Sequence, residues 1–238
     1  MVFTSLEGLK KKKKKKSINS FSLQEREGCN FLDIGANIGT YTIPIANQGI
    51  NVTCVEASLK NRMVLKENIR LNGLEDRFTL IPYGVADKEK YCTLFYYGGN
   101  QGNIEAKCDD EKIDQNMLKN PNIHFLNRIH LKTLDSFLDR PYCAMKMDIE
   151  NKEYYALKGM KNYFKKYCIK YILFECHSHS RVNDMFNLLD GLGYTLSLFM
   201  NINKSIDYNY FSTFEGGMNF VAKHKDCQTG YLPLKNLN

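Results

Sequence analysis

Short apolar runs rich in Val, Ile and Phe alternate with amphipathic stretches from residue 30 to residue 224, and this alternation limits the choice of folds most. Strands that alternate with helices in this way are typical of α/β proteins with a mostly parallel sheet. We therefore expect one α/β domain. Its expected strands are 30–36, 51–57, 78–86, 142–150, 171–176, 195–201 and 217–224.

Apolar residues recur at helical spacing between these strands. They predict helices at 39–48, 60–72, 153–164 and 182–192. The segment 91–141 breaks the alternation, since it holds one possible short strand at 92–97 followed by Gly-, Asn- and acid-rich stretches. We interpret this segment as an insertion or lid over the edge of the sheet, which is a common place for substrate recognition.

The positive charge of the chain is confined to one tract. The 238 residues carry 33 basic and 26 acidic side chains, and the run from Lys10 to Lys16 accounts for the whole excess. The neutral remainder makes a nucleic-acid partner an unlikely expectation, and the tract is expected to be a disordered tail. No apolar stretch of membrane-spanning length and no secretory signal is visible, so a cytoplasmic location is expected. A nuclear location is the alternative, because lysine tracts also serve as nuclear-targeting patterns.

The eight cysteines contain no CxxC pair, and several lie in apolar runs. They are expected to be reduced, buried thiols that pack as small hydrophobic side chains. His177 and His179 beside Cys176 do not have the spacing of zinc ligands, so no metal site is expected.

The strongest local motif is FLDIGANIGTYT at 31–42, a strand that runs into a Gly-rich turn and a helix. Glycine at 35 and 39 permits a sharp turn and a close approach of a nucleotide. The GxGxxG pattern of nicotinamide dehydrogenases is absent, because Asn37 and Thr40 stand where it needs glycine. An acid, Asp33, followed by G-x-N-x-G fits an adenosylmethionine-binding turn better.

Acidic residues follow two further expected strands. Glu56 ends the strand in VTCVEA, where a carboxylate can accept hydrogen bonds from both ribose hydroxyls of an adenosine. In MKMDIENKEYYALKG, Asp148, Glu150 and Glu153 gather at a strand end and a helix start. They could form an acidic rim that orients or deprotonates an acceptor hydroxyl, although Glu150 and Glu153 could equally cap the helix.

Glu175 and His177 follow the strand YILFEC on the same expected edge of the sheet. His177 could act as a general base, because the pKa of an imidazole lies near neutrality. A hydrogen-bonded or surface histidine is the alternative.

In this order, the segments FLDIGANIGTYT, VEA, LKENIRLNG, GGNQG, TLDSF, KMDIENKEYYALKG and ILFE resemble the FkbM-type family of adenosylmethionine-dependent methyltransferases. The resemblance implies a class I (Rossmann-like) α/β fold, with helices on both faces of a seven-stranded, mostly parallel sheet whose last strand is antiparallel. It implies S-adenosyl-L-methionine as cofactor. The cofactor residues that it implies are Asp33, Gly35, Ala36, Asn37, Gly39, Thr40, Glu56 and Ala57.

By the same resemblance Asp148, Glu150 and Glu153 match the family's second acidic motif, and with His177 they are the expected catalytic residues. Asn151 stands where the family has Gly. The expected boundaries are a Lys-rich tail at 1–28, a methyltransferase domain at 29–226 and a C-terminal tail at 227–238.

The resemblance implies that the reaction is O-methylation of a small sugar-like or glycan-related acceptor. Three alternatives stay open. A nicotinamide dehydrogenase would need the GxGxxG pattern, which this chain lacks. A nucleic-acid methyltransferase would use the same cofactor half, with Lys10 to Lys16 on a phosphate backbone. A non-catalytic cofactor-binding module would keep the fold without turnover.

Overall fold

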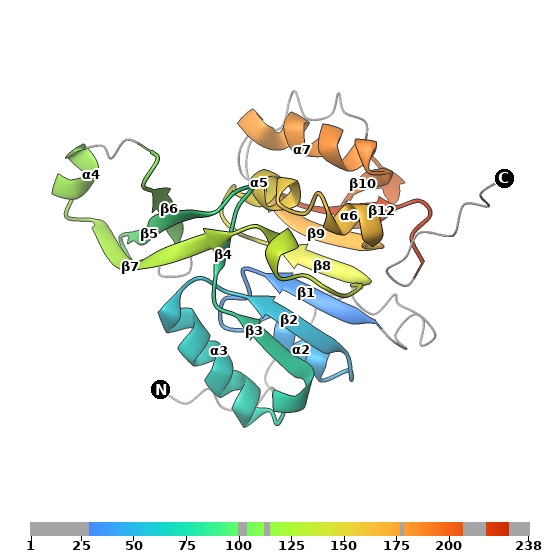
Figure 1. Ribbon diagram of the computed structural model, residues 1–238, viewed down its shortest axis with the longest axis horizontal. Helices are drawn as coiled ribbons and strands as arrows, with labels where there is room; N and C mark the ends of the chain where they lie inside the picture. Colours follow the sequence, from blue (N-terminus) through green and yellow to red (C-terminus); the bar gives the residue numbers. More distant parts are fainter. Residues whose placement is uncertain (1–28, 100–103, 112–114, 177–178, 207–217, 229–238) are drawn as a thin grey trace.

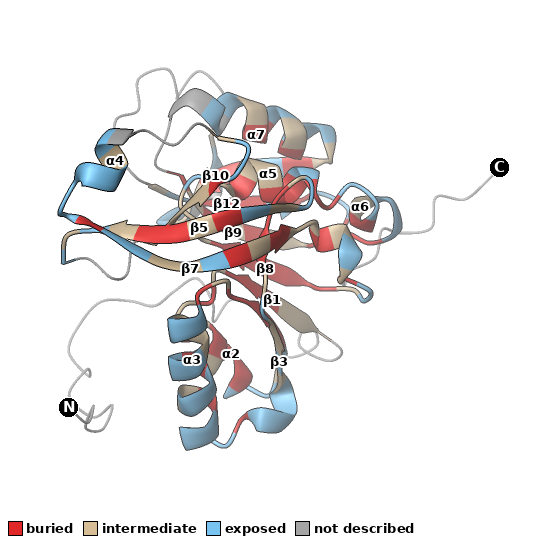
Figure 2. Ribbon diagram, turned by 60° about the vertical axis from the view of Figure 1, so that its left-hand side comes forward, coloured by how far each residue is buried: buried red, intermediate tan, exposed pale blue. Residues whose placement is uncertain are grey.

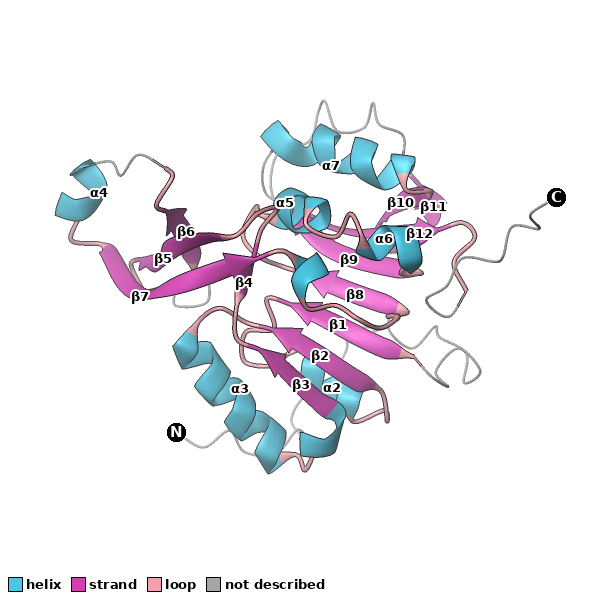
Figure 3. Cartoon of the chain, viewed as in Figure 1, coloured by secondary structure: helices cyan, strands magenta, loops and turns pink. Residues whose placement is uncertain are grey.

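The computed structural model of the chain describes residues 29–99, 104–111, 115–176, 179–206 and 218–228 (Figures 1 and 3). The Lys10 to Lys16 tract and His177 lie outside these ranges. Eight strands form the main sheet, in the spatial order β11 (Asn201–Ser205), β10 (Tyr194–Leu198), β12 (Met218–His224), β9 (Tyr171–Cys176), β8 (Ala144–Met147), β1 (Asn30–Ile34), β2 (Asn51–Val55) and β3 (Phe78–Ile81).

The main sheet is mostly parallel. β3, β2, β1, β8 and β9 pair in parallel, and β12 is antiparallel to both of its neighbours. The expected antiparallel last strand is confirmed, but the expected count of seven strands is wrong for the described residues. The expected strand 195–201 is in fact two, because the chain turns after Leu198 and returns as β11, with Asn201 opposite Leu198.

Helices cover both faces of the sheet, as expected (Figure 1). One face packs against α5 (Glu153–Lys158), α6 (Tyr163–Lys166) and α7 (His179–Gly191), and the other against α2 (Thr42–Ala46) and α3 (Leu59–Leu71). Successive side chains of a strand point to opposite faces, so Leu32 and Ile34 of β1 join the first core while Val52 and Cys54 of β2 join the second. Figure 2 shows the central strands as a mixture of buried and intermediate residues, with β8 buried throughout.

The helix expected at 153–164 is two short helices. The chain leaves α5 at Gly159, where a Cβ would lie 2.3 Å from the carbonyl oxygen of Ala86. The carboxylate of Asp135 then accepts the backbone N–H groups of Asn162 and Tyr163 at 2.8 and 2.7 Å, at the start of α6. The predicted helix is thus two helices, separated at a closely packed glycine and at a segment whose N–H groups the Asp135 side chain caps.

The segment expected to be an insertion forms most of a second sheet. Its spatial order is β4 (Gly84–Val85), β7 (Ile123–Lys132), β5 (Lys90–Tyr97) and β6 (Glu105–Cys108), and α4 (Gln115–Lys119) precedes β7. A small apolar core that includes Leu94, Ile129 and Leu131 lies on one face of this sheet. The second sheet lies beside the carboxyl ends of β1, β2 and β8 (Figure 1).

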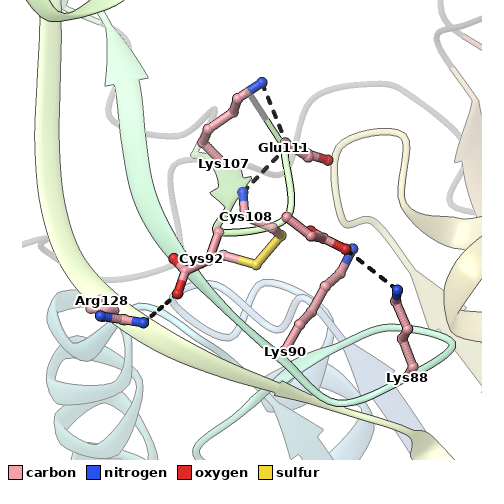
Figure 4. The surroundings of a disulfide bond; sticks show 9 residues. Lys88, Lys90, Cys92, Lys107, Cys108, Glu111 and Arg128 are labelled. Atoms are coloured by element: carbon pink, nitrogen blue, oxygen red, sulfur yellow. Dashed lines mark hydrogen bonds and ion pairs between the residues drawn. A yellow bond between two sulfur atoms is a disulfide. The ribbon is translucent and has the colours of Figure 1, made fainter. Parts of the chain in front are cut away.

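Six of the eight cysteines form disulfides, so the expectation of reduced thiols is wrong. The pairs are Cys29–Cys143, Cys92–Cys108 and Cys168–Cys227, while Cys54 and Cys176 are buried free thiols. Cys92 and Cys108 stand opposite each other in the β5–β6 ladder (Figure 4). The expected C-terminal tail begins at Cys227, which is instead bonded to Cys168.

No helix in the described part of the chain is both long enough and apolar enough to cross a membrane.

The disulfides predict a thiol count. Denatured protein alkylated without reductant should carry two labels, on Cys54 and Cys176, and eight labels after reduction. Reduction should also destabilise the fold, since the Cys168–Cys227 bond closes a separation of 59 residues, a loop whose closure contributes about 4 kcal/mol in the chain-entropy model. Mass spectrometry measures the labels, and eight labels without reductant would contradict the pairing.

Candidate functional site

A cavity of about 440 Å³ opens where the carboxyl ends of β1, β2 and β8 meet the second sheet. Its walls include Gly35, Asn37, Glu56 and Ala57 from the first two strand ends, and Asp148 and Glu150 from the segment after β8. Leu94, Ile104, Ile129 and Leu131 give the second sheet an apolar wall. Ligands of open parallel sheets bind outside the carboxyl ends of the strands, so this is the candidate functional site.

The turn after β1 requires glycine at two positions, because both have positive φ, as the predicted sharp turn needs, and both are closely packed. Gly35 has φ of +73°, and a Cβ there would lie 2.0 Å from the carbonyl oxygen of Asp148. Gly39 has φ of +96°, and a Cβ there would lie 2.8 Å from the Leu65 side chain. Gly35 lines the cavity and lets two loops touch, whereas Gly39 lets the turn pack on α3.

The Glu56 carboxylate fastens two backbone segments at the cavity wall. Its two oxygens accept the backbone N–H groups of Asn37 and Ser58, both at 2.8 Å. Burial raises the pKa of this carboxyl above its ordinary value, and these hydrogen bonds oppose the shift. Each carboxylate oxygen has a further acceptor site, so Glu56 can also accept ribose hydroxyls from a ligand in the cavity.

Asp33 is fully buried and does not belong to the described lining of the cavity. One carboxylate oxygen accepts the Thr42 hydroxyl at 2.6 Å, and the other has no hydrogen-bond donor. Burial raises the pKa of the Asp33 carboxyl. Its support of a bound ligand is therefore indirect.

Only one of the other predicted cofactor residues lines the cavity. Ala57 lines the cavity, whereas Ala36, Gly39 and Thr40 are outside its described lining. Ala36 is buried and donates its N–H to the carbonyl of Val55, and Thr40 is exposed.

The acidic residues after β8 also separate into two groups. Asp148 and Glu150 line the cavity. Glu153 is 4% exposed and outside the described lining, and its carboxylate accepts the Ile149 N–H at 2.9 Å. It therefore holds the loop that carries Asp148 and Glu150, a role close to the helix-capping alternative.

The loop after β8 passes through left-handed backbone at two successive residues. Glu150 has φ of +53° and Asn151 has φ of +67°. Asn adopts this region more readily than most residues, which explains how Asn151 can stand where the family has Gly.

Several residues near the cavity were not predicted as site residues, among them Tyr155, Ser58 and Lys146. Tyr155 and Ser58 line the cavity, and Lys146, at 6% exposure, lies between Asp33 and Asp148. The signal for Lys146 was a lysine inside the apolar run AMKM, because a buried ammonium group needs acidic partners.

Glu153 predicts a pH-dependent stability. Burial raises the pKa of its carboxyl to about 7, so between pH 4.5 and 7 the folded state holds a proton that the unfolded state releases. Stability is then lost as the pH rises through this window, by up to about 3 kcal/mol. Glu153→Gln keeps an acceptor for Ile149 and removes the charge, so its melting temperature should exceed that of wild type at pH 8 and match it near pH 5. An equal difference at both pH values would contradict this assignment.

Asn151 predicts a glycine preference. Asn151→Ala should lower the free energy of unfolding by about 1 kcal/mol, because at positive φ the Cβ of alanine comes too close to the backbone carbonyl oxygen. Asn151→Gly should equal or exceed wild type in denaturant titration. Asn47→Ala, at φ of −61° on the exposed end of α2, is the matched control and should change stability by less than about 0.5 kcal/mol. Similar losses in all three variants would be evidence against backbone strain at 151.

The site fits S-adenosylmethionine. The turn from Gly35 to Asn37 and the Glu56 carboxylate border one cavity that continues to Asp148. Its apolar wall from the second sheet suits an adenine ring, and its carboxylates suit hydroxyls and a cation.

Comparison with known proteins agrees with this geometry. The model of the methyltransferase FkbM domain matches residues 33–196. A methyltransferase FkbM from Methylobacillus flagellatus has a similar structure, with a TM-score of 0.51 and 15% identity over 82% of this chain and 43% of the other. This chain thus spans less than half the length of that protein.

Two weaker likenesses are an rRNA methylase from Streptococcus thermophilus and a precorrin-6y C5,15-methyltransferase from Geobacter metallireducens. The first has a TM-score of 0.47 and 11% identity over 84% of this chain and 91% of its own. The second has a TM-score of 0.43 and 11% identity over 84% and 85%. No curated protein sequence matches this chain. Since the domain model covers most of the chain, the protein belongs to the FkbM family of S-adenosylmethionine-dependent methyltransferases.

Proposed function

We propose that this enzyme transfers a methyl group to a hydroxyl of a small sugar-like or glycan-related acceptor. The observation that carries the proposal is a single cavity that joins Gly35, Asn37 and Glu56 to the carboxylates of Asp148 and Glu150. The proposed cofactor residues and a proton acceptor therefore border the same cavity.

When bound, S-adenosylmethionine supplies an electrophilic methyl group on a sulfonium sulfur and leaves as a neutral thioether. Glu56 would hold the ribose hydroxyls, and the backbone from Gly35 to Asn37 would border the amino-acid part. Asp148 would orient the acceptor hydroxyl and take its proton as the oxygen–carbon bond forms. Holding the acceptor in line contributes about 7 to 11 kcal/mol in favourable cases.

Polar and aromatic groups beside Asp148 support a sugar-like acceptor. Lys152 and Glu150 line the cavity and can bind hydroxyl groups, and the Tyr155 ring can pack against the C–H face of a sugar. An RNA acceptor is the competing outcome.

The cellular location follows from a separate feature. The three disulfides weigh against the cytoplasmic location that the sequence predicts, because such bonds persist in oxidising compartments. We therefore place the acceptor in an oxidising compartment.

A transfer assay tests the function. With methyl-labelled cofactor, label should enter mono- and oligosaccharides and not RNA from the same cells. Asp148→Asn should lower turnover by about 10²-fold or more, because it keeps the shape and removes the proton acceptor. Asp190→Asn, on the exposed side of α7, is the control and should keep wild-type turnover.

Three results would contradict the proposal. Label in RNA alone would favour the nucleic-acid alternative, and cofactor binding without transfer to any acceptor would favour the non-catalytic module. Normal turnover in Asp148→Asn would remove Asp148 from the reaction.

A further inference from the structure

We propose that Lys146 is a positioning residue that fixes the Gly35 turn and the Asp148 carboxylate relative to each other at the cavity. This inference rests on the proposed function, because it assigns these two groups to the cofactor end of the site.

The register of the sheet brings the three charged groups together. Asp33 of β1 and Lys146 of β8 are Cα partners in the parallel ladder, so their side chains lie side by side on the α2 face. Asp148 follows two residues after Lys146, just beyond the strand end. One ammonium group therefore meets a carboxylate from each of two neighbouring strands.

The Lys146 ammonium contacts both walls of the cavity. Its Nζ donates to the carbonyl oxygen of Gly35 at 2.8 Å, and it lies 3.5 Å from Oδ2 of Asp148 and 3.7 Å from Oδ1 of Asp33. The Tyr41 ring centroid lies 5.4 Å away. Gly35 and Asp148 line the cavity and Asp33 does not, so two of the three acceptors belong to the site.

A lysine that only neutralised Asp33 would not need to contact the Gly35 carbonyl and the Asp148 carboxylate. The Asp33 oxygen that faces Lys146 has no hydrogen-bond donor, whereas the Gly35 carbonyl receives the hydrogen bond at 2.8 Å. The shortest contact of Lys146 is thus with the turn after β1. The two loops are also in close backbone contact, since a Cβ at Gly35 would lie 2.0 Å from the Asp148 carbonyl oxygen.

The ammonium also sets the charge that a ligand meets. The Asp148 side chain is 40% exposed, whereas the Lys146 side chain is 7% exposed. The buried ammonium group partly neutralises the negative charge of the Asp148 carboxylate. Without the ammonium, the Asp148 carboxylate would attract a cation more strongly. S-adenosylmethionine carries a sulfonium cation and S-adenosylhomocysteine a neutral thioether, so the pair reports on this charge.

Calorimetric titration of both ligands tests the proposal. Lys146→Met should weaken S-adenosylhomocysteine binding by about tenfold or more. It should weaken S-adenosylmethionine binding less. The affinity for S-adenosylmethionine divided by the affinity for S-adenosylhomocysteine should therefore rise by about threefold or more. The shift in ratio should vanish when Asp148→Asn is also present. Lys223→Met, an exposed lysine of β12 in the same sheet, is the matched control and should leave both affinities unchanged.

Two further variants separate positioning from simple neutralisation. In an Asp33→Asn background, which leaves no buried carboxylate for Lys146 to neutralise at 33, Lys146→Met should still cost about tenfold. The same double variant should fold if Lys146→Met alone does not, because one charge of each sign is removed. Lys146→Gln keeps a donor for the Gly35 carbonyl and should recover part of the affinity while the ratio stays shifted.

An affinity that recovers fully in the Asp33→Asn background, or a ratio that does not change in Lys146→Met, overturns the proposal. Wild-type protein that binds neither ligand overturns the proposed function, and this inference with it. Wild-type binding with an unaffected Lys146→Met variant overturns this inference alone.

Discussion

The site depends on one buried cation between two neighbouring parallel strands. Lys146 approaches Asp33, Asp148 and the Gly35 carbonyl within 3.7 Å, and it does so at the edge where the first turn and the second acidic segment touch. A buried ammonium group is costly unless charged or polar partners surround it. The β1–β8 ladder sets the spacing of the two strands, and the partners of Lys146 join the turn after β1 to the segment after β8 at their carboxyl ends, beside the cavity.

The other parts of the site surround the carboxyl ends of β1 and β8. Glu56 fastens the end of β2 to the same turn through the Asn37 N–H, and Glu153 fastens the loop after β8 through the Ile149 N–H. The second sheet closes the open side with apolar residues. The carboxylates of Glu56 and Glu153 thus each hold a backbone segment of the site. Some of the acidic residues in these motifs therefore support the backbone and do not face a ligand.

The regular elements could be predicted from the sequence, because their periodicity is local. The strand expected at 171–176 is β9, and the helix expected at 60–72 is α3 with a shift of one residue. The family and the cofactor followed from ordered motifs. Among the site residues, Gly35, Asn37, Glu56, Ala57, Asp148 and Glu150 lie on the cavity as the motifs indicated.

What could not be predicted depends on contacts between distant segments. The Cys29–Cys143 pair spans 114 residues and is visible only once β1 and β8 are neighbours. A Cβ at Gly39 would meet the Leu65 side chain of α3, and one at Gly159, where α5 ends, would meet the Ala86 carbonyl oxygen. The inward position of Asp33 follows from the pairing of β1 with β8, which no spacing within FLDIGANIGTYT records.

A crystal structure with S-adenosylhomocysteine bound tests the central claim most directly. The account predicts the ribose hydroxyls on the Glu56 carboxylate, the adenine against the apolar wall of the second sheet, and the thioether facing Asp148, with the Lys146 ammonium still on the Gly35 carbonyl. A ligand bound away from this cavity, or a Lys146 side chain that leaves both Gly35 and Asp148, would contradict it.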